Sequence, residues 1–219
     1  MRSVIFDFDG TLLDSMQIWT EIDRAFLLEN GIEPPEGISD IVKKMSIEES
    51  SAYFVERFSL PMTPEAVSRR IEEMADAAYR YDLQLKEGAG ELLEGLWQRG
   101  IPCCIVSVTY PSLLEAAIQR LKIGSYVSFY LTPASAAEGK HTPALYQAAA
   151  KRLGTDIADT VVVEDALYAA RTAKNAGFYT VGVLDPVGKP DWDAMRALCD
   201  RTTESLCTLC DASFYSIFH

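Results

Sequence analysis

Short runs of apolar residues recur along the chain, separated by longer segments in which apolar positions have a helical spacing. In most of these runs apolar side chains fill successive positions rather than alternate ones, which is typical of strands buried on both faces of a sheet. The helical spacing is clear at Leu92, Leu93, Leu96 and Trp97, which predict one face of a helix that ends at Gly100. We predict five strands, at residues 4–6, 102–106, 126–131, 160–163 and 179–183.

A long segment after the first strand carries only helical signals. Thr63-Pro64 combines a capping hydroxyl with a proline at the first helical position. Ser46 and Glu49 match a capping box, in which the two side chains satisfy each other's helix-end N–H groups. Residues 15–85 are therefore predicted to be all-helical.

Strands that alternate with helices of this length predict a parallel sheet with right-handed crossovers. We assign the chain to the α/β class, as a Rossmann-like parallel sheet core with an inserted all-helical domain. The core comprises residues 1–14 and 86–219, and the inserted domain comprises residues 15–85. A helix after Asp191 and a strand near residues 203–206 are predicted to complete the core.

The composition is that of an ordinary globular protein with an acidic balance. The 219 residues are 48% hydrophobic and 24% charged, and the net charge is -12. Nucleic acids and anionic membrane surfaces demand a basic footprint, so neither is expected as the main partner. No stretch approaches the roughly 20 uninterrupted apolar residues of a transmembrane helix, and no signal-peptide pattern is expected at the amino terminus.

The cysteines favour a reducing compartment. They are five in number, and Cys103 and Cys104 are adjacent in an apolar run, which is typical of buried thiols. Cys207 and Cys210 have C-x-x-C spacing without a second such pair, so a zinc site is not expected there. We therefore expect a cytoplasmic protein.

The first strand ends in two carboxylates one residue apart, Asp7 and Asp9, followed by Gly10 and Thr11. If the strand geometry continued, both acids would face one site, because residues i and i+2 point the same way. Their mutual repulsion and desolvation would be relieved by a divalent cation. The competing interpretation is a solvated Asp-Phe-Asp-Gly turn.

Other strands are also followed by polar groups that suit a phosphate-and-metal site. Ser107 and Thr109 follow the second strand, Lys140 lies beyond the third, and Glu164 and Asp165 end the fourth. Each has a simpler alternative: Ser107 could cap the next helix, and the two acids could be favoured by a helix dipole. Their joint appearance at strand ends, where open α/β sheets bind ligands, favours a shared site.

Taken together, four segments resemble the four motifs of the haloacid dehalogenase superfamily, and more narrowly its phosphatases and β-phosphoglucomutases with a helical cap. These segments are Asp7 to Thr11, Ser107, Lys140 within residues 139–143, and Glu164-Asp165. The resemblance extends to about residue 185 and implies that the helical insertion is a cap, or lid, over the site.

The resemblance also implies catalytic roles. Asp7 would be the nucleophile that forms an aspartyl-phosphate, and Asp9 the general acid and then base. Asp7, the main-chain carbonyl of Asp9, and Asp165 would hold Mg²⁺, with Glu164 contributing through water. An oxygen-only ligand set suits Mg²⁺ better than zinc.

Phosphate binding is assigned to a second group of residues. Ser107 and the main-chain N–H groups of Gly10 and Thr11 would bind phosphate oxygens. Lys140 would offset the charge gathered by the carboxylates and the phosphate. Val108, in the same phosphate-binding segment, takes a position where many relatives carry Asn, so one side-chain donor is missing.

The leading function is a Mg²⁺-dependent phosphatase that acts on a small phosphorylated metabolite, in a protein expected to be a monomer or weak homodimer. A β-phosphoglucomutase-like isomerase is the alternative, but the basic cap residues that such enzymes use fall at Trp19 and Ile47. A non-catalytic regulator on the same fold is a third possibility. The leaving group and the roles of His141 and Tyr168 stay open, as do those of the cap residues Trp19, Lys43, Lys44 and Met45.

Overall fold

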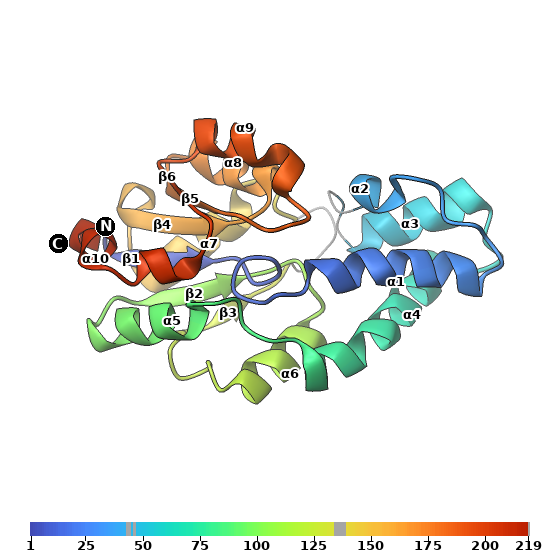
Figure 1. Cartoon of the computed structure of the whole chain (residues 1–219), viewed down its shortest axis with the longest axis horizontal. Helices are drawn as coiled ribbons and strands as arrows, with labels where there is room; N and C mark the ends of the chain where they lie inside the picture. The colour runs from blue at the N-terminus through green and yellow to red at the C-terminus, as the bar shows by residue number, and fades with distance from the viewer. Residues whose placement is uncertain (43–44, 46, 134–138, 219) are drawn as a thin grey trace.

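The computed structural model describes residues 1–42, 45, 47–133 and 139–218 of the chain. Within them, six strands form one parallel sheet in the order β3-β2-β1-β4-β5-β6 (Figure 1). The predicted α/β fold with a Rossmann-like parallel sheet is confirmed. The strands are β1 (Ser3–Phe6), β2 (Cys103–Val106), β3 (Tyr130–Leu131), β4 (Thr160–Glu164), β5 (Tyr179–Val183) and β6 (Arg201–Thr203).

The central strands are buried on both faces, as their apolar runs predict. Val4 and Phe6 pack into a cluster with α5 and α6, whereas Ile5 between them packs into a cluster with α7 and α8. This division follows from the alternation of side chains along a strand. The core helices are α5 (Ala89–Gln98), α6 (Pro111–Leu121), α7 (Ala144–Leu153), α8 (Leu167–Asn175), α9 (Trp192–Leu198) and α10 (Ala212–Tyr215), with short 3₁₀ turns at Ile157–Asp159, Lys189–Asp191, Leu206–Leu209 and Ser216–Phe218.

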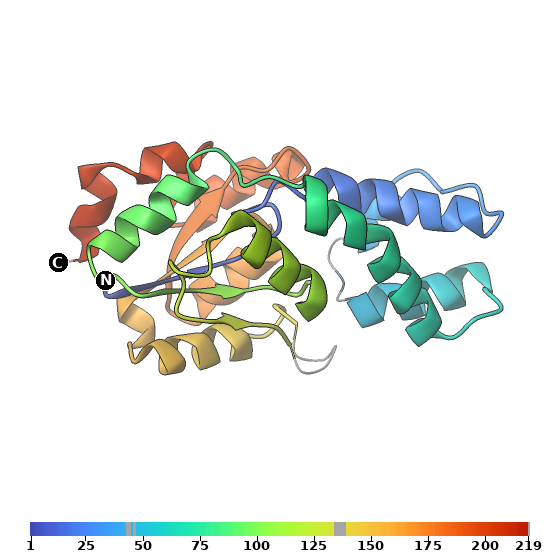
Figure 2. The same ribbon diagram turned by 90° about the horizontal axis from the view of Figure 1, so that it is seen from below.

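Helices α1 to α4 form a body beside the sheet rather than on one of its faces (Figures 1 and 2). Thr63 caps α4 as predicted, since its side chain accepts a hydrogen bond from the Ala66 N–H at 3.3 Å. The predicted capping residue Ser46 lies outside the described residues. The body comprises α1 (Met16–Glu29), α2 (Ile38–Val42), α3 (Ile47–Phe58) and α4 (Pro64–Ala77), which continues into a π-helical turn at Ala78–Asp82.

Two predicted strands differ from the observed ones. The strand expected at residues 126–131 is reduced to Tyr130–Leu131, because it lies at the edge of the sheet and pairs only with β2. The last strand lies at Arg201–Thr203, and Leu206 belongs to a 3₁₀ turn instead. Both errors concern edge strands, whose limits depend on a single neighbouring strand.

The strand order reverses at β1, which lies between β2 and β4. Such a reversal opens a crevice at the carboxyl ends of the strands, where open α/β sheets bind ligands. The helical body joins the core there through two paired segments. The Asp14 N–H donates to the Gln84 carbonyl at 3.0 Å, and the Lys86 N–H to the Leu12 carbonyl at 2.8 Å. The division of the chain into residues 1–14 with 86–219 and 15–85 stays a prediction.

Across the described part of the chain, no helix has both the length and the apolar character that a membrane crossing requires.

Candidate functional site

Three acids from two neighbouring strands meet at the carboxyl end of the sheet. Asp7 follows β1, Glu164 ends β4 and Asp165 follows it, and one carboxylate oxygen of each lies within 4.8 Å of the others. All three side chains are buried. Since Glu164 is the last residue of a strand and α8 begins only at Leu167, these acids are not simply the first turn of a helix.

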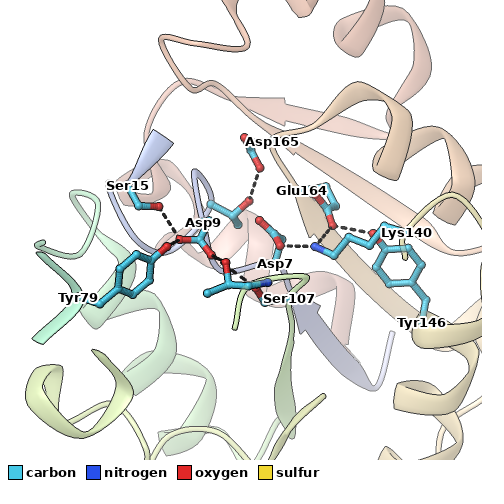
Figure 3. A network of polar contacts seen from close by, with 11 residues as sticks. Asp7, Asp9, Ser15, Tyr79, Ser107, Lys140, Tyr146, Glu164 and Asp165 are labelled. Carbon is cyan, nitrogen blue, oxygen red and sulfur yellow. Dashed lines mark hydrogen bonds and ion pairs between the residues drawn. The ribbon is translucent and has the colours of Figure 1, made fainter. Parts of the chain in front are cut away.

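Lys140 lies among these acids and is itself buried, with 2% of its surface exposed. Its ammonium forms an ion pair with Asp7 and another with Glu164, the latter at 2.6 Å (Figure 3). Burial alone would lower the pKa of Lys140, but the two carboxylates raise it above its ordinary value. Tyr146 donates to the same Glu164 oxygen at 2.6 Å. Lys140 is therefore held as a cation at the centre of the cluster.

The cluster has more negative charge than Lys140 can balance. Burial raises the pKa of Asp7 well above its usual range although Lys140 opposes this, and burial with the neighbouring Glu164 raises the pKa of Asp165 to about 7. The Glu164 Oε2 atom is buried and has no hydrogen-bond partner among the described residues. A divalent cation would hold these acids ionised and would use the unpaired oxygen. The donor set, which consists of oxygen atoms, fits such a cation.

The turn after β1 is fitted closely to Asp165. Gly10 has a φ of +81°, and a Cβ atom at this position would lie 2.4 Å from Asp165 Oδ2, so only glycine is accommodated. The Thr11 hydroxyl donates to Asp165 Oδ1 at 3.2 Å. The Gly10 N–H, predicted to bind phosphate, donates to the Leu13 carbonyl at 2.9 Å. It would have to leave this bond to serve a phosphate.

The Asp9 carboxylate is not part of the acid cluster but is held by hydroxyl groups. Strand β1 ends at Phe6, so the side chains of Asp7 and Asp9 do not keep the strand alternation that would place them side by side. Asp9 Oδ1 accepts from Ser15 at 2.6 Å and from Tyr79, and Oδ2 accepts from Thr109 (Figure 3). Asp9 therefore faces the connections to the helical body, while Asp7 faces the acids.

Ser107 belongs to the site rather than to a helix cap. Its Oγ accepts from the Thr109 N–H at 3.0 Å and lies 3.4 Å from Asp9 Oδ2. Helix α6 has no side-chain cap and begins with Pro111 at its first turn. The capping interpretation of Ser107 is therefore wrong.

Two tyrosines in the site had no strong signal in the sequence. Tyr79 was expected only to pack, yet its hydroxyl donates to Asp9 and accepts from the Trp19 indole N–H at 2.9 Å. Tyr146 occupies an ordinary apolar position of α7. One signal for Tyr79 does exist in the structure: it lies in a π-helical turn, a feature frequent at functional sites.

A cavity of about 140 Å³ lies between the sheet edge and the helical body. The core side contributes the acids, Lys140, Ser107, Val108 and Tyr168, and Tyr168 stacks on His141 with ring centroids 4.6 Å apart. From the helical body come Trp19, Met45 and Ile47, among others. Lys43 and Lys44 lie outside the described residues.

Lys86 connects the helical body to the site. Its ammonium donates to the Gly10 carbonyl at 2.7 Å and pairs with Asp185 at 2.9 Å. Asp185 is only 2% exposed, so it depends on this cation and on the Val187 N–H, which donates to its other oxygen. The pair joins the segment after the helical body, the Gly10 turn and the end of β5.

Replacing Lys86 with Met is expected to destabilise the protein by about 3 kcal/mol, because it leaves Asp185 buried without its cation. Urea denaturation of the wild type and the variant measures the difference. The Lys174–Asp200 pair, whose side chains are 34% and 28% exposed, provides a matched control. Lys174→Met should cost less than about 1 kcal/mol, and equal losses in the two variants would contradict the role assigned to Lys86.

Comparison with known proteins identifies two relatives with named activities. The chain is 29% identical over 188 residues to a probable pseudouridine-5'-phosphatase of Drosophila melanogaster, covering 83% of this chain and 81% of the relative. It is 27% identical over 190 residues to (DL)-glycerol-3-phosphatase 2 of Arabidopsis thaliana, covering 84% and 79%.

The fold is shared with solved structures. The crystal structure of CbbY from Rhodobacter sphaeroides, solved in complex with phosphate, matches with a TM-score of 0.86 and 19% identity, covering 99% of each chain. The sequence pattern of haloacid dehalogenase-like hydrolases matches residues 1–177. This match covers well over half of the chain and confirms the resemblance found in the motifs, so the protein belongs to the haloacid dehalogenase-like hydrolase family.

Proposed function

We propose that the protein is a Mg²⁺-dependent phosphatase that hydrolyses a small phosphorylated metabolite through an aspartyl-phosphate intermediate. The observation that carries the proposal is the buried cluster of Asp7, Glu164 and Asp165 around Lys140, which opens into a cavity. Both relatives with named activities are called phosphatases, which supports the reaction class.

The chain's own residues divide the chemistry between them. An Asp7 carboxylate oxygen attacks phosphorus, and the bond to the ester oxygen breaks. Asp9 gives a proton to the departing oxygen, then takes a proton from the water that attacks the aspartyl-phosphate and releases phosphate. Lys140 offsets the charge of Asp7 and the phosphoryl group, and Ser107 is a hydroxyl donor within the same cavity.

Mg²⁺, held by Asp7, Asp165 and the Asp9 main-chain carbonyl with Glu164 nearby, would keep the carboxylates ionised and stabilise charge on the phosphoryl oxygens. The fit of these oxygen donors to a hard cation supports Mg²⁺ over zinc.

The helical body is proposed to act as a lid that excludes water during the reaction. Support comes from the hydrogen bonds of Asp9, since Ser15 and Tyr79 lie at the two connections between the helical body and the core. Movement of this body would change which hydroxyls contact the proposed acid.

The cavity wall disfavours the mutase alternative. A β-phosphoglucomutase-like enzyme must grip a second phosphate with basic cap residues, and the corresponding positions are Trp19 and Ile47. Both line the cavity. An indole and an aliphatic side chain cannot neutralise a phosphate, so a reaction that needs one phosphate fits better.

A panel of phosphate esters tests the proposed function. Sugar, nucleotide, polyol and short-chain acid phosphates are incubated with the protein in Mg²⁺ or in EDTA, and released phosphate is measured. We expect release in Mg²⁺ without any added bisphosphate, and none in EDTA. A requirement for a bisphosphate would favour the mutase, and absence of any turnover in Mg²⁺ would favour the regulator.

Replacing Tyr79 with Phe is expected to lower kcat by about tenfold while KM changes little, because Asp9 loses one charge-assisted hydrogen bond that orients it. The ring and its packing are retained. Steady-state kinetics on the best ester of the panel measures both constants.

Tyr81, two residues further on and 72% exposed, is the matched control. Tyr81→Phe should leave both constants unchanged. If the two variants behave alike, Tyr79 does not position Asp9.

A further inference from the structure

Helix α1 presents one of its faces to the cavity. Met16, Trp19, Thr20 and Asp23 all line it, at the i, i+3, i+4 and i+7 spacing that places residues on one face of a helix. Asp23 is the only acid of this helix that lines the cavity; Glu21 and Glu29 are exposed elsewhere on α1. Asp23 is thus a carboxylate on the wall opposite the sheet.

The surroundings of Asp23 do not explain why a carboxylate is kept there. It is partly buried, and the Ser39 side chain of α2 is its hydrogen-bond partner. Burial raises its pKa to about 7, and no cation among the described residues contributes to the shift. A carboxylate that is desolvated without a cation is unfavourable for folding, so its presence in a cavity wall points to a ligand.

The cavity has two chemically different ends. At the sheet end Lys140, Ser107 and the three acids would fix the phosphoryl group. Around Asp23 and Ser39 the wall is largely apolar, formed by side chains that include Trp19, Val42, Met45 and Ile71. An ester bound with its phosphorus at Asp7 must therefore direct its leaving group towards this wall.

We propose that Asp23 and Ser39 form a subsite that accepts a hydrogen bond from a hydroxyl group of the leaving alcohol, so that the preferred substrates are phosphate monoesters of polyols or sugars. The apolar side chains around the subsite would cover the carbon skeleton. The same carboxylate repels a second phosphate or a carboxylate, which selects against bisphosphates and phospho-acids. This inference rests on the proposed phosphatase function.

Three matched esters test the subsite: glycerol 3-phosphate, n-propyl phosphate and 3-phosphoglycerate, which have three carbons and differ in their hydroxyl and carboxylate groups. The wild type should prefer glycerol 3-phosphate to propyl phosphate by about tenfold or more in kcat/KM, the range of one hydrogen bond to a charged group. Phosphoglycerate should be the poorest. The corresponding six-carbon pair, sorbitol 6-phosphate and n-hexyl phosphate, covers longer leaving groups.

Asp23→Leu should remove this preference. We expect kcat/KM for the polyol esters to fall by about tenfold or more, that for the alkyl esters to stay within about twofold, and that for phosphoglycerate to rise. Asp23→Asn, which keeps an acceptor oxygen without the charge, should fall between. Glu21→Gln on the exposed face of the same helix is the control and should match the wild type. Equal losses for all esters in Asp23→Leu, or an unchanged preference, would overturn the subsite.

A binding measurement separates the subsite from the catalytic proposal. Calorimetry with Asp7→Asn, with and without Asp23→Leu, compares the affinities for the polyol and alkyl esters in the absence of turnover. Tighter binding of the polyol ester that is lost with Asp23→Leu supports the subsite even if the wild type hydrolyses nothing, which would overturn only the phosphatase. Equal affinities for the two esters would overturn the subsite even if hydrolysis is observed. An aminoalkyl phosphate that outcompetes the polyol ester would also overturn the assignment to hydroxyl groups.

Discussion

Asp7→Asn is expected to lower kcat for phosphate release by roughly 10⁴-fold or more, since an amide cannot form the covalent intermediate. The substitution is nearly isosteric, and Asp7 is buried beside Lys140, so the fold should be retained. Steady-state kinetics in Mg²⁺ gives the loss in rate. Mass spectrometry of acid-quenched reactions should detect one added phosphoryl group on the wild type and none on the variant.

Asp14→Asn is the matched control, because Asp14 is exposed and lies only a short way further along the chain. Its rate should equal that of the wild type. Residual activity of Asp7→Asn within about tenfold of the wild type would mean that water attacks phosphorus directly and that Asp7 is not the nucleophile.

Lys140→Met is expected to damage both stability and activity. Removing the cation leaves Asp7 and Glu164 buried without their common partner, which should cost about 3–5 kcal/mol in the free energy of unfolding. The rate of phosphate release should fall by about 10²-fold or more, because charge on the phosphoryl group is no longer offset. Urea denaturation in EDTA and steady-state kinetics in Mg²⁺ measure the two effects separately.

A second substitution distinguishes the electrostatic cause from a packing defect. Lys140→Met combined with Glu164→Gln removes one of the unpaired charges but keeps a hydrogen-bond acceptor for Tyr146. This double variant should recover part of the lost stability and none of the activity. Lys151→Met on the exposed side of α7 should be neutral. If the double variant is no more stable than Lys140→Met, charge imbalance is not the cause.

The sequence was informative about the sheet centre because the relevant forces act locally along the chain. Runs such as Val4-Ile5-Phe6 need no partner to be recognised, and residues 4–6 and 160–163 are indeed buried in neighbouring parallel strands. Edge strands were less predictable. Residues 126–129 are outside β3, since only one neighbouring strand limits its length.

The candidate site was predictable only in part. The motif residues Asp7, Lys140, Glu164 and Asp165 follow from their positions after strands, because parallel strands bring their carboxyl ends to one edge of a sheet. The direction of Asp9 did not follow, since the chain leaves the strand geometry after Phe6.

Contacts between distant segments were decided by the tertiary structure alone. Tyr79 is 70 residues from Asp9, and Lys86 is 99 residues from Asp185, yet each pair is in contact. A tyrosine or lysine has no local pattern that reveals a buried partner so far along the chain. Asp23 likewise resembles any polar residue of an amphipathic helix until α1 is packed over the cavity.

The sequence by itself thus determined the α/β sheet, the helical insertion and the acids at the strand ends, because hydrophobic periodicity and strand polarity are local properties. Only the tertiary structure decided which side chains surround those acids and which residues of the helical body face them. That choice depends on how two bodies pack, and packing is set by shape and charge across segments that the sequence order does not bring together.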